Sequence, residues 1–344
     1  MTKLFIIGNG FDIAHGLPTK YVDFKKFLEK NDSIFLEKIF EIYKYSFKRK
    51  LHPITHEVLN LQRNEDEYDL LWKDFEINMR NVNEDLIFDE YEFELEYETE
   101  YDDQIKENIE RDILETFYEV YKKLQSQLEE WISSIDIDNL NKKTSLINDE
   151  NCNLYLNFNY TRVLEDVYNI EDKICHIHGE IGKSSLIVGH NNKDKINELE
   201  KELDYYNTRN KILLNKEELE TGVDEYEKYE ELEETNNEFT ERMKCEELLK
   251  FYKETYKTPS YYIEKNNNFF NDILKVDEIL IIGHSLNEGD IPYFEYIFSK
   301  IKSGVKWKVY YYLEEEKEIF KNKILGLGVK EENIEMLSND EFFK

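Results

Sequence analysis

Lys-Leu-Phe-Ile-Ile-Gly-Asn-Gly-Phe-Asp, residues 3–12, is the stretch from which the fold class can be read most directly. The apolar run at 4–7 is typical of a strand buried on both faces, and the Gly-Asn-Gly after it is typical of a tight turn into a helix. Such a turn lets backbone N–H groups approach a phosphate, so Gly8, Asn9, Gly10 and Phe11 are candidates for ligand binding; alternatively, they form only a tight turn from strand to helix. No third glycine stands in GxGxxG register, which argues against a dinucleotide fingerprint of the dehydrogenase type.

The same pattern, an apolar run followed by a polar turn, recurs in the second half of the chain. It predicts helices at 161–168, 291–302 and 314–324 that alternate with strands at 152–158, 173–178, 186–188, 277–282 and 306–312. Strands that alternate with helices predict a parallel sheet. We therefore expect an α/β fold, a Rossmann-like parallel sheet flanked by helices, built as one domain from residues 1–20, 150–195 and 275–344.

The two segments between these pieces, 21–149 and 196–274, are predicted to be large helical insertions. Within the first, apolar residues keep helical spacing over three stretches, 33–48, 55–82 and 104–134. Residues 90–101 instead alternate glutamate with other side chains, mostly apolar or aromatic, so both strand and helix stay open for that stretch.

The charge of the chain limits the classes of partner. Its 344 residues have a formal net charge of −31, which argues against broad contact with duplex nucleic acid and against an anionic membrane surface. Much of the excess lies in the predicted insertions, because 84–112 contains 14 acidic residues and 198–250 contains 18. A single phosphorylated small molecule at the Gly-Asn-Gly turn stays compatible with this charge.

Cysteine usage and the absence of long apolar runs indicate the compartment. Cys152, Cys175 and Cys245 are widely spaced and form no CxxC pair, so we expect neither a structural zinc nor a disulfide framework. No stretch approaches the ~18 apolar residues of a membrane span, and the first apolar run is shorter than a signal-peptide core. We expect a cytoplasmic protein with no membrane partner.

Polar residues that can carry chemistry follow the predicted strands, at the edge where parallel sheets bind ligands. Asn159 and Thr161 can hold a sugar hydroxyl or a water, or can cap the next helix. His176 and His178 alternate along their strand, so one of them can act as a base near neutral pH. Alternatively, the pair can bind a metal with His190 or an acid as third ligand.

The sequence Gly-His-Ser-Leu-Asn at 283–287 nearly matches the G-x-S-x-G motif of serine hydrolases. In that fold the catalytic histidine follows the serine along the chain. His284 is the last histidine here and precedes Ser285, so we do not expect a serine hydrolase.

Taken together, these motifs resemble the AbiH family of bacterial phage abortive-infection proteins. The matching pieces are Ile-Ile-Gly-Asn-Gly-Phe-Asp-Ile-Ala-His-Gly-Leu-Pro-Thr at 6–19, Trp-Lys-Asp-Phe-Glu at 72–76, and the short segments 157–161, 176–179 and 282–286 with Asp290. They occur in the same order and span the chain. The resemblance implies a role in phage defence that responds to an unknown phage trigger.

The same set is similar, more distantly, to the sirtuin-like NAD-binding fold. This similarity implies that NAD or a related nucleotide is bound by Gly8, Asn9, Gly10, Phe11, Gly283, His284, Ser285 and Asp290. It implies catalytic roles for three residues: His178 matches the base, Asn159 matches the residue at the nicotinamide ribose, and Asp12 can stabilise positive charge. The four-cysteine zinc module of sirtuins is missing, so the outline fits NAD glycohydrolases better than deacylases.

We therefore expect an abortive-infection effector that binds a small nucleotide and hydrolyses the N-glycosidic bond of NAD or a related molecule. No metal ligand is assigned for this function. Two alternatives stay open. One is a metal-dependent nuclease of phage defence, with His176, His178 and acids as ligands; the other is a non-catalytic nucleotide sensor that acts on a partner. A homo-oligomer is compatible with the sequence.

Overall fold

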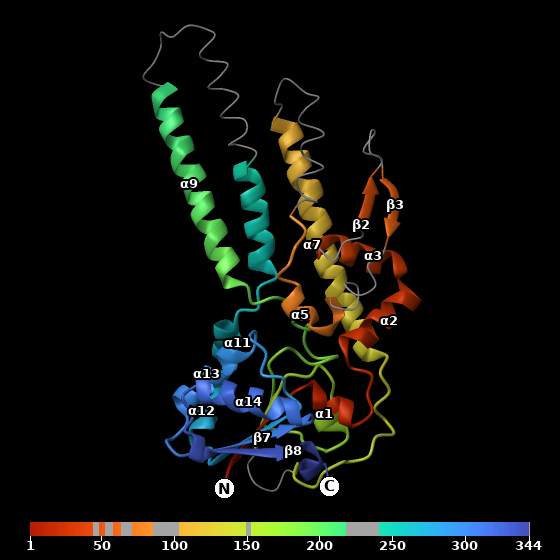
Figure 1. Ribbon diagram of the computed structural model, residues 1–344, viewed down its shortest axis with the longest axis vertical. Coiled ribbons are helices and arrows are strands. Elements are labelled where there is room, and N and C mark those ends of the chain that lie inside the picture. Colours follow the sequence, from red (N-terminus) through yellow and green to blue (C-terminus); the bar gives the residue numbers. More distant parts are fainter. Residues whose placement is uncertain are drawn as a thin grey trace. The chain divides into compact units, whose positions relative to one another are not determined.

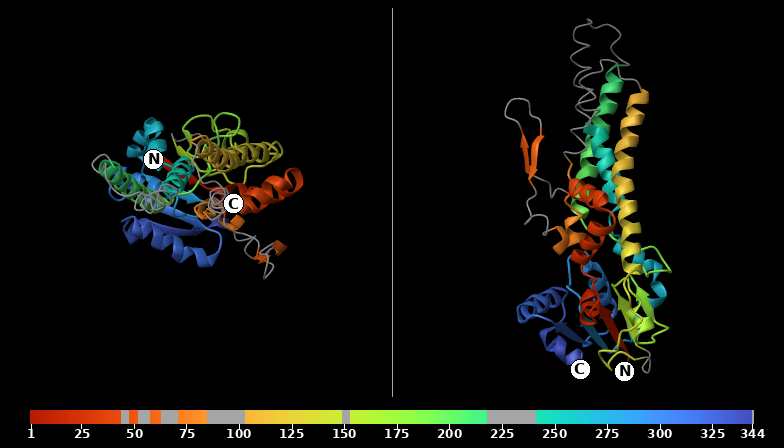
Figure 2. Two further views of the ribbon diagram at one scale, coloured as in Figure 1. Left: turned by 90° about the horizontal axis from the view of Figure 1, so that it is seen from above. Right: turned by 90° about the vertical axis from the view of Figure 1, so that its right-hand side faces the viewer.

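The structure is a computed structural model that describes residues 1–43, 48–51, 58–62, 71–84, 103–148, 153–217 and 241–343 (Figures 1 and 2). The chain divides into two compact units. Unit 1 comprises Met1–Asp32, Leu124–Val188 and Lys257–Lys344, and unit 2 comprises Ser33–Lys123 and Gly189–Tyr256. The alternating stretch 90–101 lies outside the described residues.

Unit 1 is built on a six-stranded sheet in which every neighbouring pair is parallel. Its strand order is β5-β4-β1-β6-β7-β8. The strands are β1 (Lys3–Ile7), β4 (Leu154–Asn157), β5 (Ile174–His176), β6 (Glu278–Ile282), β7 (Lys306–Tyr311) and β8 (Ile334–Ser338). Counted along the sheet, this is the Rossmann order 3-2-1-4-5-6, which confirms the predicted α/β class.

Both faces of the sheet are buried, as expected for parallel strands that lie between layers of helices. Alternate residues of β1 and β6 belong to different cores: Leu4 and Ile279 face one, and Phe5 and Leu280 face the other. The first core includes side chains of α11 (Pro259–Lys265), α13 (Ile291–Lys300) and α14 (Glu314–Gly326). The second includes side chains of α1 (Asn9–Ala14), α8 (Val163–Asp166) and α15 (Asn339–Phe342).

The described part of unit 1 contains four further helical elements, of which α12 and η1 also contribute side chains to the first core. They are α2 (Tyr21–Asn31), α12 (Asn267–Asp272), η1 (Ile273–Lys275) and η2 (Glu331–Asn333). Unit 1 thus takes in 21–32, 124–149 and 257–274 in addition to the segments expected to form the α/β domain, whereas 189–195, expected in that domain, belong to unit 2.

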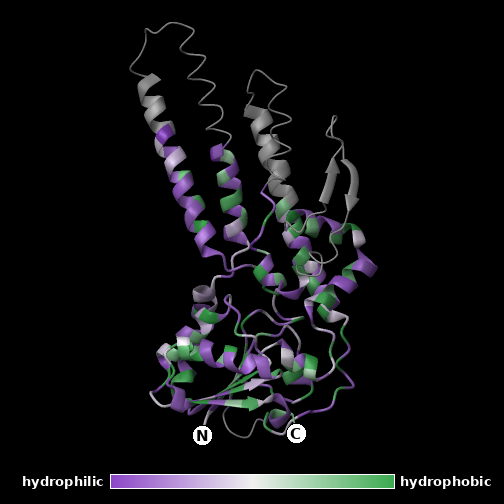
Figure 3. Ribbon diagram, in the orientation of Figure 1, coloured by the Kyte–Doolittle hydropathy of each residue, from purple (hydrophilic) through white to green (hydrophobic). Residues whose placement is uncertain are grey.

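Unit 2 is mainly helical. It contains α3 (Ser33–Ile42), α5 (Phe75–Asn78), α9 (Lys193–Glu217), a helix at 241–254, and a two-stranded sheet of β2 (Lys48–Leu51) and β3 (Val58–Gln62). The long helix α7 (Asp103–Ser133) contributes to both units. Hydrophobic residues gather on the strands of unit 1, whereas the described part of α9 is mostly hydrophilic (Figure 3). Among the described residues, no helix combines the length and apolar character that crossing a membrane requires.

Three local predictions were wrong. The helix predicted at 33–48 ends at Ile42, and within 55–82 the structure has the strand β3, because Leu59 and Leu61 fit a two-residue period as well as a helical one. Residues 186–188 form no strand: the N–H of Ile187 donates to the carbonyl of His178, at 2.8 Å, and not to a neighbouring strand. The strand β8 was not predicted.

Candidate functional site

Two glycine-containing turns meet at the carboxyl edge of the sheet, where β1 and β6 lie side by side and the strand order reverses direction. This switch point is where doubly wound α/β proteins bind ligands. A Cβ on Gly8 would stand 2.6 Å from the carbonyl oxygen of Gly283, and one on Gly283 would stand 2.3 Å from the nitrogen of Phe11. Gly283 also has a φ of +65°. The glycines are therefore required for the two backbones to approach.

The N–H groups of the first turn are already used in this contact. Gly8 donates to the carbonyl of Ile282 at 2.9 Å, and Gly10 donates to that of Gly283 at 2.8 Å. The side chain of Asn9 is bound at both ends by Thr19. Any phosphate held at this turn would therefore depend on groups other than the N–H groups of Gly8 and Gly10.

Asp12 lies buried in α1, directly after the turn. The hydroxyl of Thr161 donates to its Oδ2 at 2.6 Å, whereas its buried Oδ1 has no hydrogen-bond partner among the described residues. Burial raises the pKa of Asp12 to about 7, against the lowering effect of the hydrogen bond from Thr161 and of the nearby Asn159 side chain. Asp12 thus exchanges a proton near neutral pH, which suits a general acid or base.

Burial of Asp12 gives a first testable prediction, for the variant Asp12→Asn. The ordinary pKa of Asp12 is 3.8, and in the folded protein it is about 7. Between these two pH values the folded state holds a proton that the unfolded state has released. The free energy of unfolding therefore falls as pH rises through this window, by up to about 4 kcal/mol. The neutral amide removes this loss. We expect Asp12→Asn to be more stable than wild type by about 1–2 kcal/mol at pH 8, and the gain to vanish at pH 5.

Urea unfolding at the two pH values, followed by tryptophan fluorescence, measures this difference. The exposed Asp172 provides the control variant Asp172→Asn, which should change stability little at either pH. An equal gain for Asp12→Asn at pH 5 and pH 8 would contradict the pH linkage.

Asn159 connects the loop after β4 with the turn after β1. Its side-chain nitrogen donates to the carbonyl of Gly8 at 3.2 Å, and its backbone N–H donates to the side-chain oxygen of Asn157 at 3.1 Å. Its own side-chain oxygen is buried without a hydrogen-bond partner among the described residues. Asn159 therefore presents an unused acceptor beside the turn.

A second buried cluster joins Asp290 with two histidines. Asp290 stands just before α13, with its Oδ1 at 3.3 Å from Nε2 of His178 and its Oδ2 at 3.4 Å from Nε2 of His284. Nδ1 of His284 accepts a hydrogen bond from the N–H of Leu286 at 2.9 Å, so its Nε2 carries the proton that faces Asp290. The ring of Phe158 packs edge-on against both imidazoles.

The charge state of Asp290 follows from these partners. Burial raises its pKa, but the two facing imidazoles of His178 and His284 outweigh burial and hold the pKa well below the ordinary value. Asp290 is therefore an ionised carboxylate that orients the two rings. The contact to His178 has ion-pair distance but not hydrogen-bond geometry, so Nε2 of His178 has no hydrogen-bond partner within the described part of the chain.

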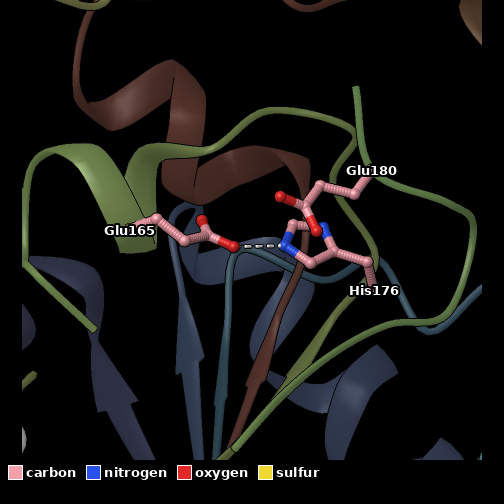
Figure 4. Close-up of side chains that lie close together, drawn as sticks. All are labelled: Glu165, His176 and Glu180. Carbon is pink, nitrogen blue, oxygen red and sulfur yellow. Dashed lines mark hydrogen bonds and ion pairs between the residues drawn. The ribbon is translucent and has the colours of Figure 1, made fainter. Parts of the chain in front are cut away.

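A third group of side chains lies at the ends of β4 and β5 (Figure 4). Nε2 of His176 is 2.7 Å from Oε1 of Glu165, which projects from α8, and the carboxylate of Glu180 lies beside the same ring. Burial raises the pKa of Glu165, but the hydrogen bond and charge of His176 outweigh burial, so that the pKa is lowered overall. Glu180 is also paired with Arg162 and Lys183.

The structure thus brings most of the predicted site residues to one edge, in two clusters. Asp12, Asn159 and Thr161 form one, and His178, His284 and Asp290 form the other. Ser285 is exposed, and its carbonyl accepts from Lys323 at 3.2 Å. Sequence reasoning missed Glu165 and Glu180, which carry no signal beyond their position after predicted strands.

His190, considered as a third metal ligand, has both ring nitrogens occupied in unit 2. Its Nε2 faces the carbonyl of Tyr252 at 3.0 Å, and its Nδ1 accepts from the N–H of Asn192 at 2.9 Å. Burial lowers its pKa to about 4. It therefore acts as a neutral, buried structural histidine, and of the two third ligands considered for a metal, His190 or an acid, the structure favours an acid.

The fold and this edge define a Rossmann-like α/β protein with buried acid and histidine clusters at the switch point of its sheet. A family model described as "Bacteriophage abortive infection AbiH" matches residues 4–311. The chain belongs to the AbiH family, and this membership implies a role in abortive infection against bacteriophage. No curated protein and no solved structure gives a significant match.

Proposed function

We propose that this chain is an abortive-infection effector that binds NAD or a related nucleotide at the switch point and hydrolyses its N-glycosidic bond. The observation that carries the proposal is a pair of buried polar atoms without hydrogen-bond partners among the described residues, Asp12 Oδ1 and Asn159 Oδ1. Unpaired buried polar atoms are costly and rare. A polar ligand at this edge would account for both.

The chemistry proposed for these residues is hydrolysis at the ribose. A water oxygen forms a bond to C1′ of the ribose, the bond from C1′ to the nicotinamide nitrogen breaks, and its electron pair stays on nicotinamide. Positive charge develops on the sugar in the transition state. The Asp12 carboxylate stabilises that charge, Asn159 holds a ribose hydroxyl, and His178, oriented by Asp290, takes the proton of the water.

Nicotinamide release from NAD by the purified full-length chain, with and without a divalent metal, measures this activity. We expect metal-independent release that falls by about 100-fold or more in His178→Ala and Asp12→Asn. Asp172→Asn, on the exposed surface, should keep wild-type activity. Circular dichroism checks that each variant is folded, and His178→Gln provides a second substitution with less loss of volume.

Because abortive infection begins with a phage, the same variants are compared in infected cells. Cells that express the wild-type chain should lose NAD before growth stops, and cells that express His178→Ala should not. Growth arrest at constant NAD, with metal-dependent cleavage of nucleic acid, would overturn the proposal in favour of a nuclease. Tight nucleotide binding without turnover during arrest would overturn it in favour of a sensor.

A further inference from the structure

We infer that Glu165, His176 and Glu180 form a binding site for a divalent transition-metal ion such as Zn²⁺. Their candidate ligand atoms, one imidazole nitrogen and two carboxylate oxygens, all lie within 4.8 Å of one another. Zinc takes such ligands at about 2.0–2.2 Å, which places them about 3.4 Å apart, so the side chains need to shift by only about 1 Å. Figure 4 shows the carboxylate of Glu165 facing a ring nitrogen of His176, with the carboxylate of Glu180 beside the same ring.

The orientation of the His176 ring favours a cation at Nε2. Its Nδ1 lies 3.2 Å from the carbonyl oxygen of Asn159, which can only accept, so Nδ1 carries a proton. The side-chain amide of Asn157 is further from Nδ1, at 3.5 Å. A histidine that donates from one nitrogen to a backbone carbonyl presents the other to a metal, as metal-binding histidines commonly do. Nε2 therefore contacts the carboxylate of Glu165 in one of two ways. Either it carries a second proton and donates it to the carboxylate, or both groups bind the same cation.

Glu165 provides an independent indication. Its Oε2 is buried and has no hydrogen-bond partner among the described residues, although Oε1 contacts His176. A carboxylate oxygen buried in this way is costly, and coordination by a metal satisfies it. The side chain of His176 is only 6 % exposed, so a cation held there is largely shielded from water.

Arg162 is the natural competitor for this site. Its guanidinium pairs with Glu180 and, at 3.2 Å, with Asp166, so part of the negative charge is already compensated. A metal ion would have to displace both Arg162 and Lys183 from Glu180, and removing the positive charge of Arg162 should tighten metal binding. This dependence separates a metal site from a plain ion-pair network.

A metal ion at this site would also affect the proposed catalytic cluster, because the charges of His176 and Glu165 both act on the carboxyl of Asp12. A divalent cation at His176 would favour the ionised form of Asp12. Metal binding is measured without nucleotide and without turnover, so failure of this inference and failure of the proposed NAD hydrolysis can be told apart.

The test is calorimetric titration of Zn²⁺ into the full-length chain after treatment with a chelator. We expect one tight site per chain, weakened by more than about 10-fold in both His176→Gln and Glu165→Gln, and tightened by about threefold or more in Arg162→Gln. Asp166→Asn is the matched control: it removes the next carboxylate along α8 and a partner of Arg162 but no ligand, so any loss of affinity should stay well below the 10-fold loss in the ligand variants.

Three results would overturn the inference. They are the absence of a stoichiometric Zn²⁺ site in the folded wild-type chain, Zn²⁺ binding that is equally tight in His176→Gln and Glu165→Gln, and binding of Mg²⁺ as tight as that of Zn²⁺. The last would mean that only oxygen ligands are involved, because Mg²⁺ avoids imidazole. Circular dichroism confirms the fold of each variant before titration.

Discussion

Gly283→Ala is expected to destabilise unit 1 by about 4 kcal/mol or more, a large share of the stability of an ordinary domain. The new methyl group would stand 2.3 Å from the nitrogen of Phe11 and 2.6 Å from the carbonyl carbon of Gly10, and neither backbone atom can move without separating the turns after β1 and β6. The φ of +65° at Gly283 adds strain that alanine bears and glycine does not. Urea unfolding monitored by circular dichroism measures the loss.

Gly304 provides the matched control for this prediction. It too has a positive φ, of +87°, but a Cβ there would meet nothing within 4 Å. Gly304→Ala should therefore show the conformational strain alone, about 1–2 kcal/mol. If Gly283→Ala cost no more than Gly304→Ala, the close approach of the two turns would not be limiting, and the explanation of the glycine motif would be wrong.

Asp290→Ala is expected to cost about 3–5 kcal/mol, because it leaves two buried imidazoles without the carboxylate that faces them. The penalty should depend on pH. The pKa of Asp290 is held well below the ordinary 3.8 in the folded state, so its contribution is complete above about pH 4 and is lost as pH falls toward the folded pKa. The difference between wild type and variant should shrink in acid, as measured by urea unfolding from pH 7 to pH 3.

The exposed Asp272, which pairs with Lys275 at 2.7 Å, is the control for Asp290. Asp272→Ala removes a surface ion pair and should change stability by about 1 kcal/mol or less. A cost for Asp290→Ala as small as that, or a cost that does not change with pH, would show that the two histidines do not depend on the carboxylate.

The parts of the fold that could be predicted from sequence are those whose signal is local. Residues 3–7 and 278–282 are apolar runs that end in glycine, and they are the central strands β1 and β6. β8, Ile-Glu-Met-Leu-Ser, lies at the edge of the sheet and is only partly buried, so it lacks the continuous apolar run of a central strand. Leu59 and Leu61 satisfy either period, and pairing with β2 gives a strand there.

In the candidate site, too, the features that depend on local sequence could be predicted, and those that depend on contacts between distant segments could not. Glycine and histidine at strand ends predicted that these residues gather at one edge of the sheet, because parallel strands bring their carboxyl ends together. Which side chains pair there depends on loops far apart in sequence. His178 faces Asp290, whereas His176, two residues earlier, faces Glu165, because β5 ends at His176 and the simple alternation stops.

The central position of β1 has a consequence for how the protein is made. Leu4 pairs with Leu154, 150 positions along the chain (154 − 4), and with Ile279, 275 positions along (279 − 4). At about 5–20 residues per second, the ribosome adds the second partner about 14–55 s after the first strand. Such long-range pairing also folds slowly. The edge where Gly8 meets Gly283 therefore assembles only after β6 has been synthesised, so the proposed site does not exist in a nascent chain that carries β1 and β4 alone.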